Sequence, residues 1–308
     1  MGKPRPFFSV IIPTDGRPRQ LAACLQSLAC IEYPYDRFEV VVVDDGSKTP
    51  LEAVVHSFSD KIDVTLLTQS HSGPAAARNA GAQRARGTFL AFTDDDCMPK
   101  ADWLQKLAAR FTQTPDHLIG GRTLNALPDN PYSTASQILI DYLYTYYNPT
   151  FNQACFLTSN NLAVPAARFR ALGGFDTSFP LAAAEDRDFC DRWRDRTHQM
   201  IYAPEVLVYH AHTLTLRTFL QQHFRYGRGA FHFRQARTQR GQSRIRLEPT
   251  RFYVNLLRYR SSQAQARTAL SPAALLFLSQ VANAAGFFWE RGAKRSENKP
   301  SRVREILR

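Results

Sequence analysis

The chain is poor in cysteine, and its cysteines follow no metal-binding or disulfide pattern. Five of them are scattered over 308 residues, and no C-x-x-C pair occurs. An odd number without paired spacing argues against a disulfide framework and against a zinc knuckle. We therefore expect a protein of the reducing cytosol.

Glycine-rich phosphate loops are also missing. The sequence contains no Walker loop and no G-x-G-x-x-G string, so a bound phosphate would be held by a metal ion and side chains instead of a glycine cradle. The apolar run at residues 7–12 closes at Pro13 and is too short for a signal-peptide core.

One long charge-free stretch exists, at residues 270–289, and its length is the minimum for a bilayer span. Polar residues and Pro272 lower its hydrophobicity, so a core or interfacial helix that ends at Gly286 is the competing interpretation. Basic residues flank it, with Trp289 at the edge, as suits an anionic cytoplasmic leaflet; they are Arg267, Arg291, Lys294 and Arg295.

Acidic residues are scarce in the last third of the chain. Residues 213–308 hold 19 Lys and Arg against 4 Asp and Glu, whereas residues 1–212 hold 20 against 23. A basic excess favours an anionic partner such as a lipid surface, a phosphorylated ligand or nucleic acid. The shift predicts two parts, a domain at 1–212 and a basic, mostly helical extension at 213–308 that associates with an anionic membrane surface.

Strand and helix patterns alternate in the first part. Apolar runs rich in β-branched residues predict strands at 7–12, 38–43, 64–67 and 88–92, and helical spacing follows each of them, at 21–28, 51–58, 75–86 and 103–111. This order predicts an α/β fold with an open, mostly parallel sheet flanked by helices. Later patterns predict strands at 119–124 and 201–210, and helices at 132–147, 185–196, 216–237 and 252–267.

Acidic residues follow three of the expected strands. Asp15, the pair Asp44 and Asp45, and the run Asp94 to Asp96 would meet at one edge, where open parallel sheets bind ligands. Like charges so close together need a cation, and Mg²⁺ or Mn²⁺ would bind such carboxylates together with a diphosphate.

Six strings resemble those of family 2 glycosyltransferases of the GT-A fold and occur in the family's order over about 200 residues. They are SVIIPT (9–14), VVVVDDGS (40–47), GPAAARNAG (73–81), FTDDD (92–96), GGFD (173–176) and AEDRDF (184–189). The resemblance implies a Rossmann-like catalytic domain and an inverting hexosyltransferase. Such an enzyme moves a sugar from a nucleotide diphosphate, UDP by preference, to a hydroxyl acceptor with Mn²⁺ or Mg²⁺.

The resemblance also implies roles for single residues. Asp94 and Asp96 match the family's D-x-D metal motif, and Asp186 matches the catalytic base, whose proton affinity the neighbouring Glu185 would raise. His210, or its rival His212, would complete the metal site. The residues expected to bind the donor are Thr14, Arg17, Asp44, Asp45, Arg78, Asn79, Asp94, Asp95, Arg225 and Arg228. The chain departs from the family at Asp15-Gly16 before Arg17, where an aromatic-Asn pair is common, so the contacts to the donor base stay open there.

Two features of the second half remain open between a functional and a structural role. Gln222 and Arg225-Tyr226 match a Q-x-x-R-W signature of membrane-bound relatives, with Tyr in place of Trp. The tyrosine-rich helix at 132–147 either lines an acceptor groove or packs in the core.

The expected acceptor is a carbohydrate, a lipid-linked molecule or another hydroxyl compound, in a pathway such as cell-envelope polysaccharide synthesis. The expected location is cytoplasmic, peripheral at the cytoplasmic face of the membrane. The competing functions are a nucleotidyltransferase of related fold, which would release pyrophosphate, and a nucleic-acid-binding protein that uses the basic extension. The acidic rim makes nucleic acid the less favoured partner.

Overall fold

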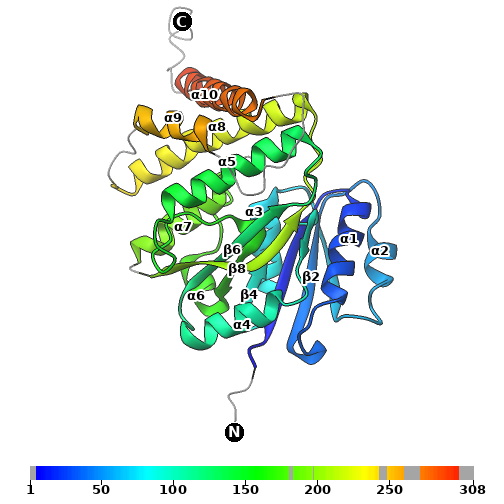
Figure 1. Ribbon diagram of the computed structural model, residues 1–308. Helices are drawn as coiled ribbons and strands as arrows, with labels where there is room; N and C mark the ends of the chain where they lie inside the picture. Colours follow the sequence, from blue (N-terminus) through cyan, green and yellow to red (C-terminus); the bar gives the residue numbers. More distant parts are fainter. Residues whose placement is uncertain (1–4, 180–182, 197, 243–247, 260–270, 298–308) are drawn as a thin grey trace, which may run out of the picture.

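The computed structural model describes residues 5–179, 183–196, 198–242, 248–259 and 271–297. Parts of the patterns discussed above, at residues 243–247 and 260–270 with Arg267, lie outside the described residues. The strands form one sheet in the order β3-β2-β1-β4-β7-β6-β8-β5. Helices cover both of its faces, as Figure 1 shows.

The first half of the sheet is parallel. Its strands are β1 (Phe8–Thr14), β2 (Phe38–Asp45), β3 (Val64–Gln69) and β4 (Phe89–Phe92). Every residue of β1 and β2 is buried, which explains why these strands read as continuous apolar runs without alternation. The connecting helices are α1 (Pro18–Ala29), α2 (Glu52–His56) and α3 (Pro74–Arg84). These elements confirm the predicted alternation and the α/β class.

The second half mixes directions. Strand β7 (Leu162–Pro165) runs antiparallel between β4 and β6 (Leu118–Asn125), and β8 (Met200–His210) pairs parallel with β6. The short β5 (Cys97–Pro99) is antiparallel to β8. The helices here are α4 (Trp103–Gln113), α5 (Pro131–Tyr147), α6 (Ala166–Leu172) and α7 (Glu185–Asp195). Sequence patterns missed β5 and α6, because three and seven residues are too few to show a period.

Two apolar layers hold the sheet. One packs α1, α2 and α4 against one face, and the other packs α3, α6, α7 and part of α5 against the opposite face. The chain direction fixes where chemistry takes place, because the carboxyl ends of β1, β2 and β4 point to the same edge. In Figure 1 this edge lies toward α8 (Leu216–Gln239), away from the N-terminus.

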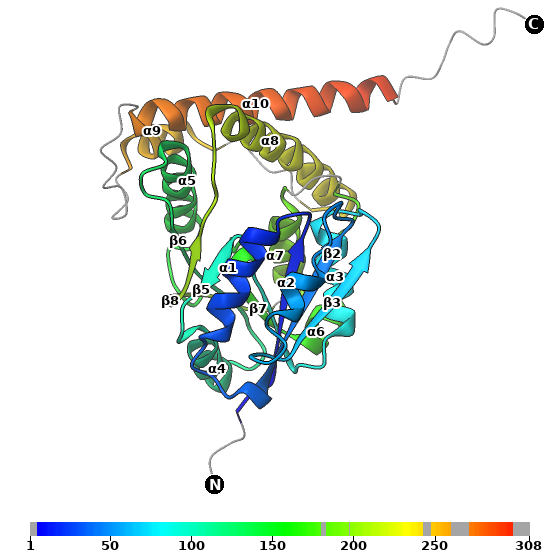
Figure 2. The ribbon, with the colours of Figure 1, turned by 90° about the vertical axis from the view of Figure 1, so that its right-hand side faces the viewer.

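Three helices lie beyond that edge. They are α8, α9 (Thr250–Arg258) and α10 (Pro272–Glu297), and Figure 2 shows α10 lying across the top of α8. A prediction was wrong here: Gly286 does not end the helix. Its missing side chain lets the backbone of α8 approach, since a Cβ at Gly286 would run into the carbonyl oxygen of Phe224. Gly227 likewise makes room for the carbonyl oxygen of Asn283.

This backbone contact yields a test. Gly286→Ala and Gly227→Ala should each force α8 and α10 apart and cost about 2 kcal/mol, a typical price of overpacking. Gly292→Ala is the matched control, because it lies in the same helix with nothing within 4 Å of the added Cβ, and it should be neutral or slightly stabilising. Urea unfolding and amide hydrogen exchange in α10 measure the effect; equal behaviour of all three variants would contradict the close contact.

Candidate active site

Carboxylates gather where β1, β2 and β4 end. Thr14 is the last residue of β1, Asp44 and Asp45 end β2, and Asp94 to Asp96 follow β4 directly. All of these residues except Asp94 are buried, and four of the buried ones are acidic. Such an arrangement is costly unless each carboxylate has donors or counter-charges nearby.

Asp95 is the innermost carboxylate, with no exposed surface. It accepts hydrogen bonds from Thr14 Oγ1 at 2.6 Å and from Arg17 Nε at 3.0 Å. Arg17 also binds Asp96, through Nη1 at 2.9 Å. Burial nevertheless raises the pKa of Asp95 to about 7, against the opposing charge of Arg17. The loop between β1 and α1 therefore holds the run Asp94 to Asp96 in place, and Arg17 of this loop lies in the predicted site.

Arg78 joins the two halves of the site. Its guanidinium donates to Asp94 Oδ1 at 2.7 Å and to Glu185 Oε1 at 3.1 Å, and it lies over the ring of Phe175 at 5.7 Å. Its side chain is 5% exposed. A single cation from α3 therefore connects the carboxylate after β4 with the start of α7, where the predicted base Asp186 lies.

Glu185 and Asp186 open helix α7 on a strained turn. The preceding Ala184 has φ 72°, a left-handed conformation that is costly for a residue other than glycine. Burial, followed by the charge of Asp186, raises the pKa of Glu185 to about 7. Burial also raises the pKa of Asp186, against hydrogen bonds from backbone N–H groups of Arg187 and Ser159 and the charge of Arg78. The pair therefore holds a proton more tightly than isolated carboxyl groups do.

His210 lies at the end of β8 with its Nε2 3.2 Å from Asp96 Oδ1. Asp96, His210 and Cys97 bring a carboxylate oxygen, an imidazole nitrogen and a thiol within 4.8 Å of one another. Burial keeps the pKa of the Cys97 thiol well above its ordinary value, so the pair suited to a hard divalent cation is Asp96 and His210. The ring of His212 lies 5.0 Å from that of His210, centroid to centroid, and is tilted by 31°. Asp94, predicted as a second ligand, is paired with Arg78.

Some predicted donor-binding residues have structural partners. Asp45 accepts from Gln69 Nε2 and from the backbone N–H groups of Ser72 and Gly73, so its carboxylate orders the loop before α3. Asp44 accepts from the N–H of Ser47 at 2.9 Å.

Three more predicted donor-binding residues are Asn79 and, on α8, Arg225 and Arg228. Asn79 and Arg228 bind other groups, and Arg225 lies at the surface. Asn79 both donates to and accepts from the backbone of Phe175, at 2.8 and 2.9 Å, and so anchors the Gly-Gly-Phe-Asp turn. Arg228 points to α10, where it binds Glu290 Oε2 at 2.5 Å and covers the ring of Trp289. Arg225 is exposed on α8.

Tyr226, on α8, lies near enough to the predicted site for its carboxylates to act on the phenol. Burial first, then the charges of Asp186, Glu185 and Asp94, hold the pKa of its phenol above the ordinary range, and its hydroxyl accepts from Gln222 Nε2 at 2.8 Å. The Q-x-x-R-Y string pointed to this helix, but periodicity alone did not show which of its residues faces inward.

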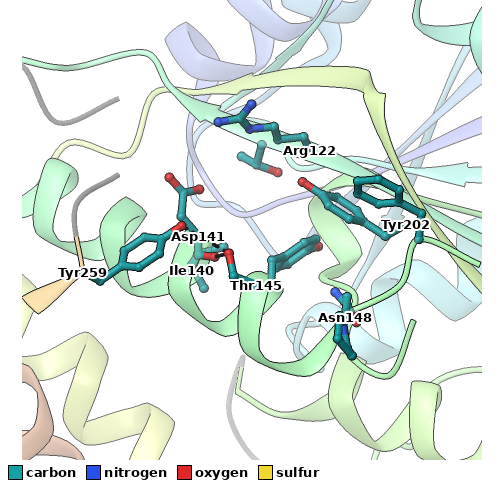
Figure 3. Close-up of a pocket in the computed structure, with 11 residues that line it drawn as sticks. Arg122, Ile140, Asp141, Thr145, Asn148, Tyr202 and Tyr259 are labelled. Carbon is teal, nitrogen blue, oxygen red and sulfur yellow. Dashed lines mark hydrogen bonds between the residues drawn. The ribbon is translucent and has the colours of Figure 1, made fainter. Parts of the chain in front are cut away.

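A separate cavity of about 320 Å³ lies beside α5 and the strands β6 and β8 (Figure 3). Aromatic side chains line it together with Arg122 and Asp141; the aromatic ones are Tyr144, Phe151, Tyr202 and Tyr259. The hydroxyl of Tyr144 bonds Thr158 Oγ1 at 2.9 Å, next to Ser159, whose backbone N–H binds Asp186. The tyrosine-rich helix therefore packs in the core through Tyr142 and also borders this cavity through Tyr144, while its role in an acceptor groove stays a prediction.

The sheet, the acidic run after β4 and the carboxylate pair at α7 define a class of enzyme. Residues 9–171 match the model of Glycosyl transferase family 2, and the chain belongs to this family. It is a glycosyltransferase with the GT-A fold.

The relatives agree with that class. The chain is similar to the glycosyltransferase AglE of Haloferax volcanii, with 27% identity over 227 residues that cover 73% of each chain. It is 29% identical over 232 residues to a pre-mycofactocin glycosyltransferase of Mycobacterium tuberculosis, covering 72% of this chain and 46% of that one. The chain thus spans less than half the length of the mycobacterial relative.

Solved structures share the fold. The mannosyltransferase PcManGT of Pyrobaculum calidifontis, in complex with GDP-Man and Mn²⁺, has a TM-score of 0.62 at 20% identity and covers 97% of this chain and 82% of its own. Residues 1–349 of TarS from S. aureus, in complex with UDP-GlcNAc, have a TM-score of 0.53 at 19% identity. The match covers 94% of this chain and 92% of the TarS chain.

The raised pKa of Glu185 predicts a pH effect on stability. The folded protein keeps a proton on Glu185 up to about pH 7, whereas the unfolded chain releases it near 4.5, so stability falls as the pH rises through this window. Glu185→Gln should make the decrease in melting temperature between pH 5 and pH 8 smaller, and the exposed Glu32→Gln should leave it unchanged. The measurement is thermal unfolding in metal-free buffer. If the melting temperature of Glu185→Gln fell as much as that of wild type, the Glu185 carboxyl would be ionised throughout this pH range.

Proposed function

We propose that this glycosyltransferase inverts the anomeric centre of a nucleoside-diphosphate sugar, with UDP as the nucleotide, and that Asp186 is the general base. The observation that carries the proposal is the chain of contacts from Asp94 through Arg78 to Glu185 and its neighbour Asp186. It supports one site with a donor side at β4 and a base side at α7. One base opposite one leaving group is the requirement of a single-displacement, inverting transfer.

The reaction then needs little more than positioning. Asp186 takes the proton of the acceptor hydroxyl as that oxygen forms a bond to the anomeric carbon. The bond from the anomeric carbon to the diphosphate oxygen breaks, and the nucleoside diphosphate leaves with the electron pair. The raised pKa of Asp186 makes it a better proton acceptor than an exposed aspartate.

Asp96 and His210 would hold a divalent cation, Mn²⁺ or Mg²⁺. The ion would neutralise the diphosphate as it departs. The fit rests on the 3.2 Å approach of a carboxylate oxygen and an imidazole nitrogen, and a neighbour of the same fold binds Mn²⁺. Arg17 bridges Asp95 and Asp96, and so keeps the ligand carboxylate in place.

Donor binding falls to the edge formed by β1, β2 and β4. Thr14, Asp44 and Asp94 line it directly, while Asp45 and Asn79 shape the loops around it. The solved neighbours are complexes with GDP-Man and with UDP-GlcNAc, which supports a nucleotide-sugar donor for this chain.

For the acceptor we propose the cavity of Figure 3. Aromatic rings stack on sugar rings, and Arg122 and Asp141 supply polar groups at its wall, so a carbohydrate suits its chemistry. We assign residues 1–212 to catalysis and 213–308 to a covering extension. The location we propose is cytoplasmic, peripheral at the membrane, and the role is the assembly of cell-envelope polysaccharide or a lipid-linked glycan.

The test measures release of nucleoside diphosphate from a panel of UDP-, GDP- and dTDP-sugars with Mn²⁺, Mg²⁺ or EDTA. Asp186→Asn should bind the donor with wild-type affinity but lose at least about a hundredfold in turnover, because the proton acceptor is gone. Asp96→Ala should weaken binding of both metal and donor. Asp116→Asn, an exposed aspartate beside Arg168, is the control and should keep full activity.

Other outcomes point elsewhere. Release of pyrophosphate from nucleoside triphosphates would indicate a nucleotidyltransferase. Full turnover in Asp186→Asn would overturn the role of the base while leaving the family assignment intact.

A further inference from the structure

The last helix, α10, exposes several large apolar side chains to solvent. Phe277, Val281 and Phe288 are 57%, 50% and 61% exposed, and Leu278 and Trp289 are 39% and 53% exposed. These positions follow helical spacing and form one stripe along α10, about 18 Å long at 1.5 Å per residue. The opposite face buries Leu275 and Leu276 together with Ser279, Gly286 and Glu290.

That buried face fixes the helix to the protein. Glu290 Oε1 lies 2.9 Å from His232 Nε2, and Glu290 also binds Arg228 of α8. Gly227 and Gly286 let the two backbones touch. Among the described residues, Pro272–Arg295 is the one helix long and apolar enough to cross a membrane, yet a span would carry Glu290 and its partners into hydrocarbon. The contacts therefore favour a helix that stays docked on α8.

We infer that α10 lies in the plane of an anionic lipid bilayer and inserts the stripe of Phe277, Leu278, Val281, Phe288 and Trp289 into it. The inference adds a membrane-binding site to the proposed function and rests on separate residues. Positive charge favours an anionic surface as the partner. Residues 213–308 carry 19 basic against 4 acidic groups, and Arg291 and Arg295 are exposed on α10 itself. An apolar stripe bordered by basic residues, with tryptophan at its margin, is the pattern of interfacial helices.

The position of α10 relates this surface to catalysis. One side of α8 packs on the turn before Asp186, because a Cβ at Gly229 would meet the Ala183 carbonyl oxygen at 2.5 Å. The other side of α8 carries α10, and Figure 2 shows the end of α10 extending past the rest of the molecule. Between the base and the apolar stripe lie two helices, each about 10 Å thick. The active site therefore lies close behind the face that would touch the bilayer.

The experiment uses the full chain and vesicles of phosphatidylcholine, with or without about 30% phosphatidylglycerol, in a flotation assay. Wild type should float with the anionic vesicles, and 0.5 M NaCl should weaken binding by screening. Phe277→Ser/Phe288→Ser should bind at least about tenfold more weakly, because two inserted aromatic rings are lost. Tyr35→Ser is the control. Tyr35 is 59% exposed, close to the 61% of Phe288, but it lies in residues 1–212, far from α10 in the sequence.

Three results would overturn the inference. The first is equal vesicle binding by wild type and the double variant. The second is a dimer in light scattering that the double variant dissociates, which would assign the stripe to a second copy. The third is binding to RNA without binding to vesicles. Donor hydrolysis in vesicle-free solution should be the same in wild type and the double variant. If neither protein hydrolyses a donor, the proposed function is contradicted, but the vesicle-binding result still tests the membrane inference.

Discussion

The proposed site depends on the contacts that the buried guanidinium of Arg78 makes with two carboxylates. It lies between Asp94, which follows β4, and Glu185, which begins α7, at 2.7 and 3.1 Å. Without a cation at this place, carboxylates from two distant parts of the chain would repel one another in a region with little water. The ion pairs therefore join the donor edge of the sheet to the helix that presents Asp186, and the strained turn at Ala184 is tolerated within this arrangement.

A second layer of organisation comes from α8. Its tyrosine Tyr226 faces the carboxylates, while Arg237 and Arg240 bind Asp188 and Asp191 of α7. The opposite side of the same helix bears α10 through close backbone contact. Helix α8 is thus more than an appended helix, because its side chains bind the helix that begins at the proposed base. A partner bound to the outer face of α10 would be separated from the proposed base by α10 and α8.

Several elements could be predicted from sequence because one physical signal dominated each of them. Continuous burial made β1 and β2 visible as β-branched runs, and acidic residues at their ends placed the site. Other features depended on neighbours. Gly286 has the residue type of a helix end, but it lies inside α10, where the backbone of Phe224 approaches it. Arg228, expected among the donor-binding residues, binds Glu290 of α10.

By itself, the sequence determined the α/β class, the family and the identity of the acidic residues, since these depend on local composition, periodicity and ordered motifs. The tertiary structure decided which of those residues meet. It paired Asp94 with Arg78, placed His210 beside Asp96, and turned the apolar stripe of α10 outward. A sequence pattern shows which face of an element is buried, but not which distant residue packs against that face.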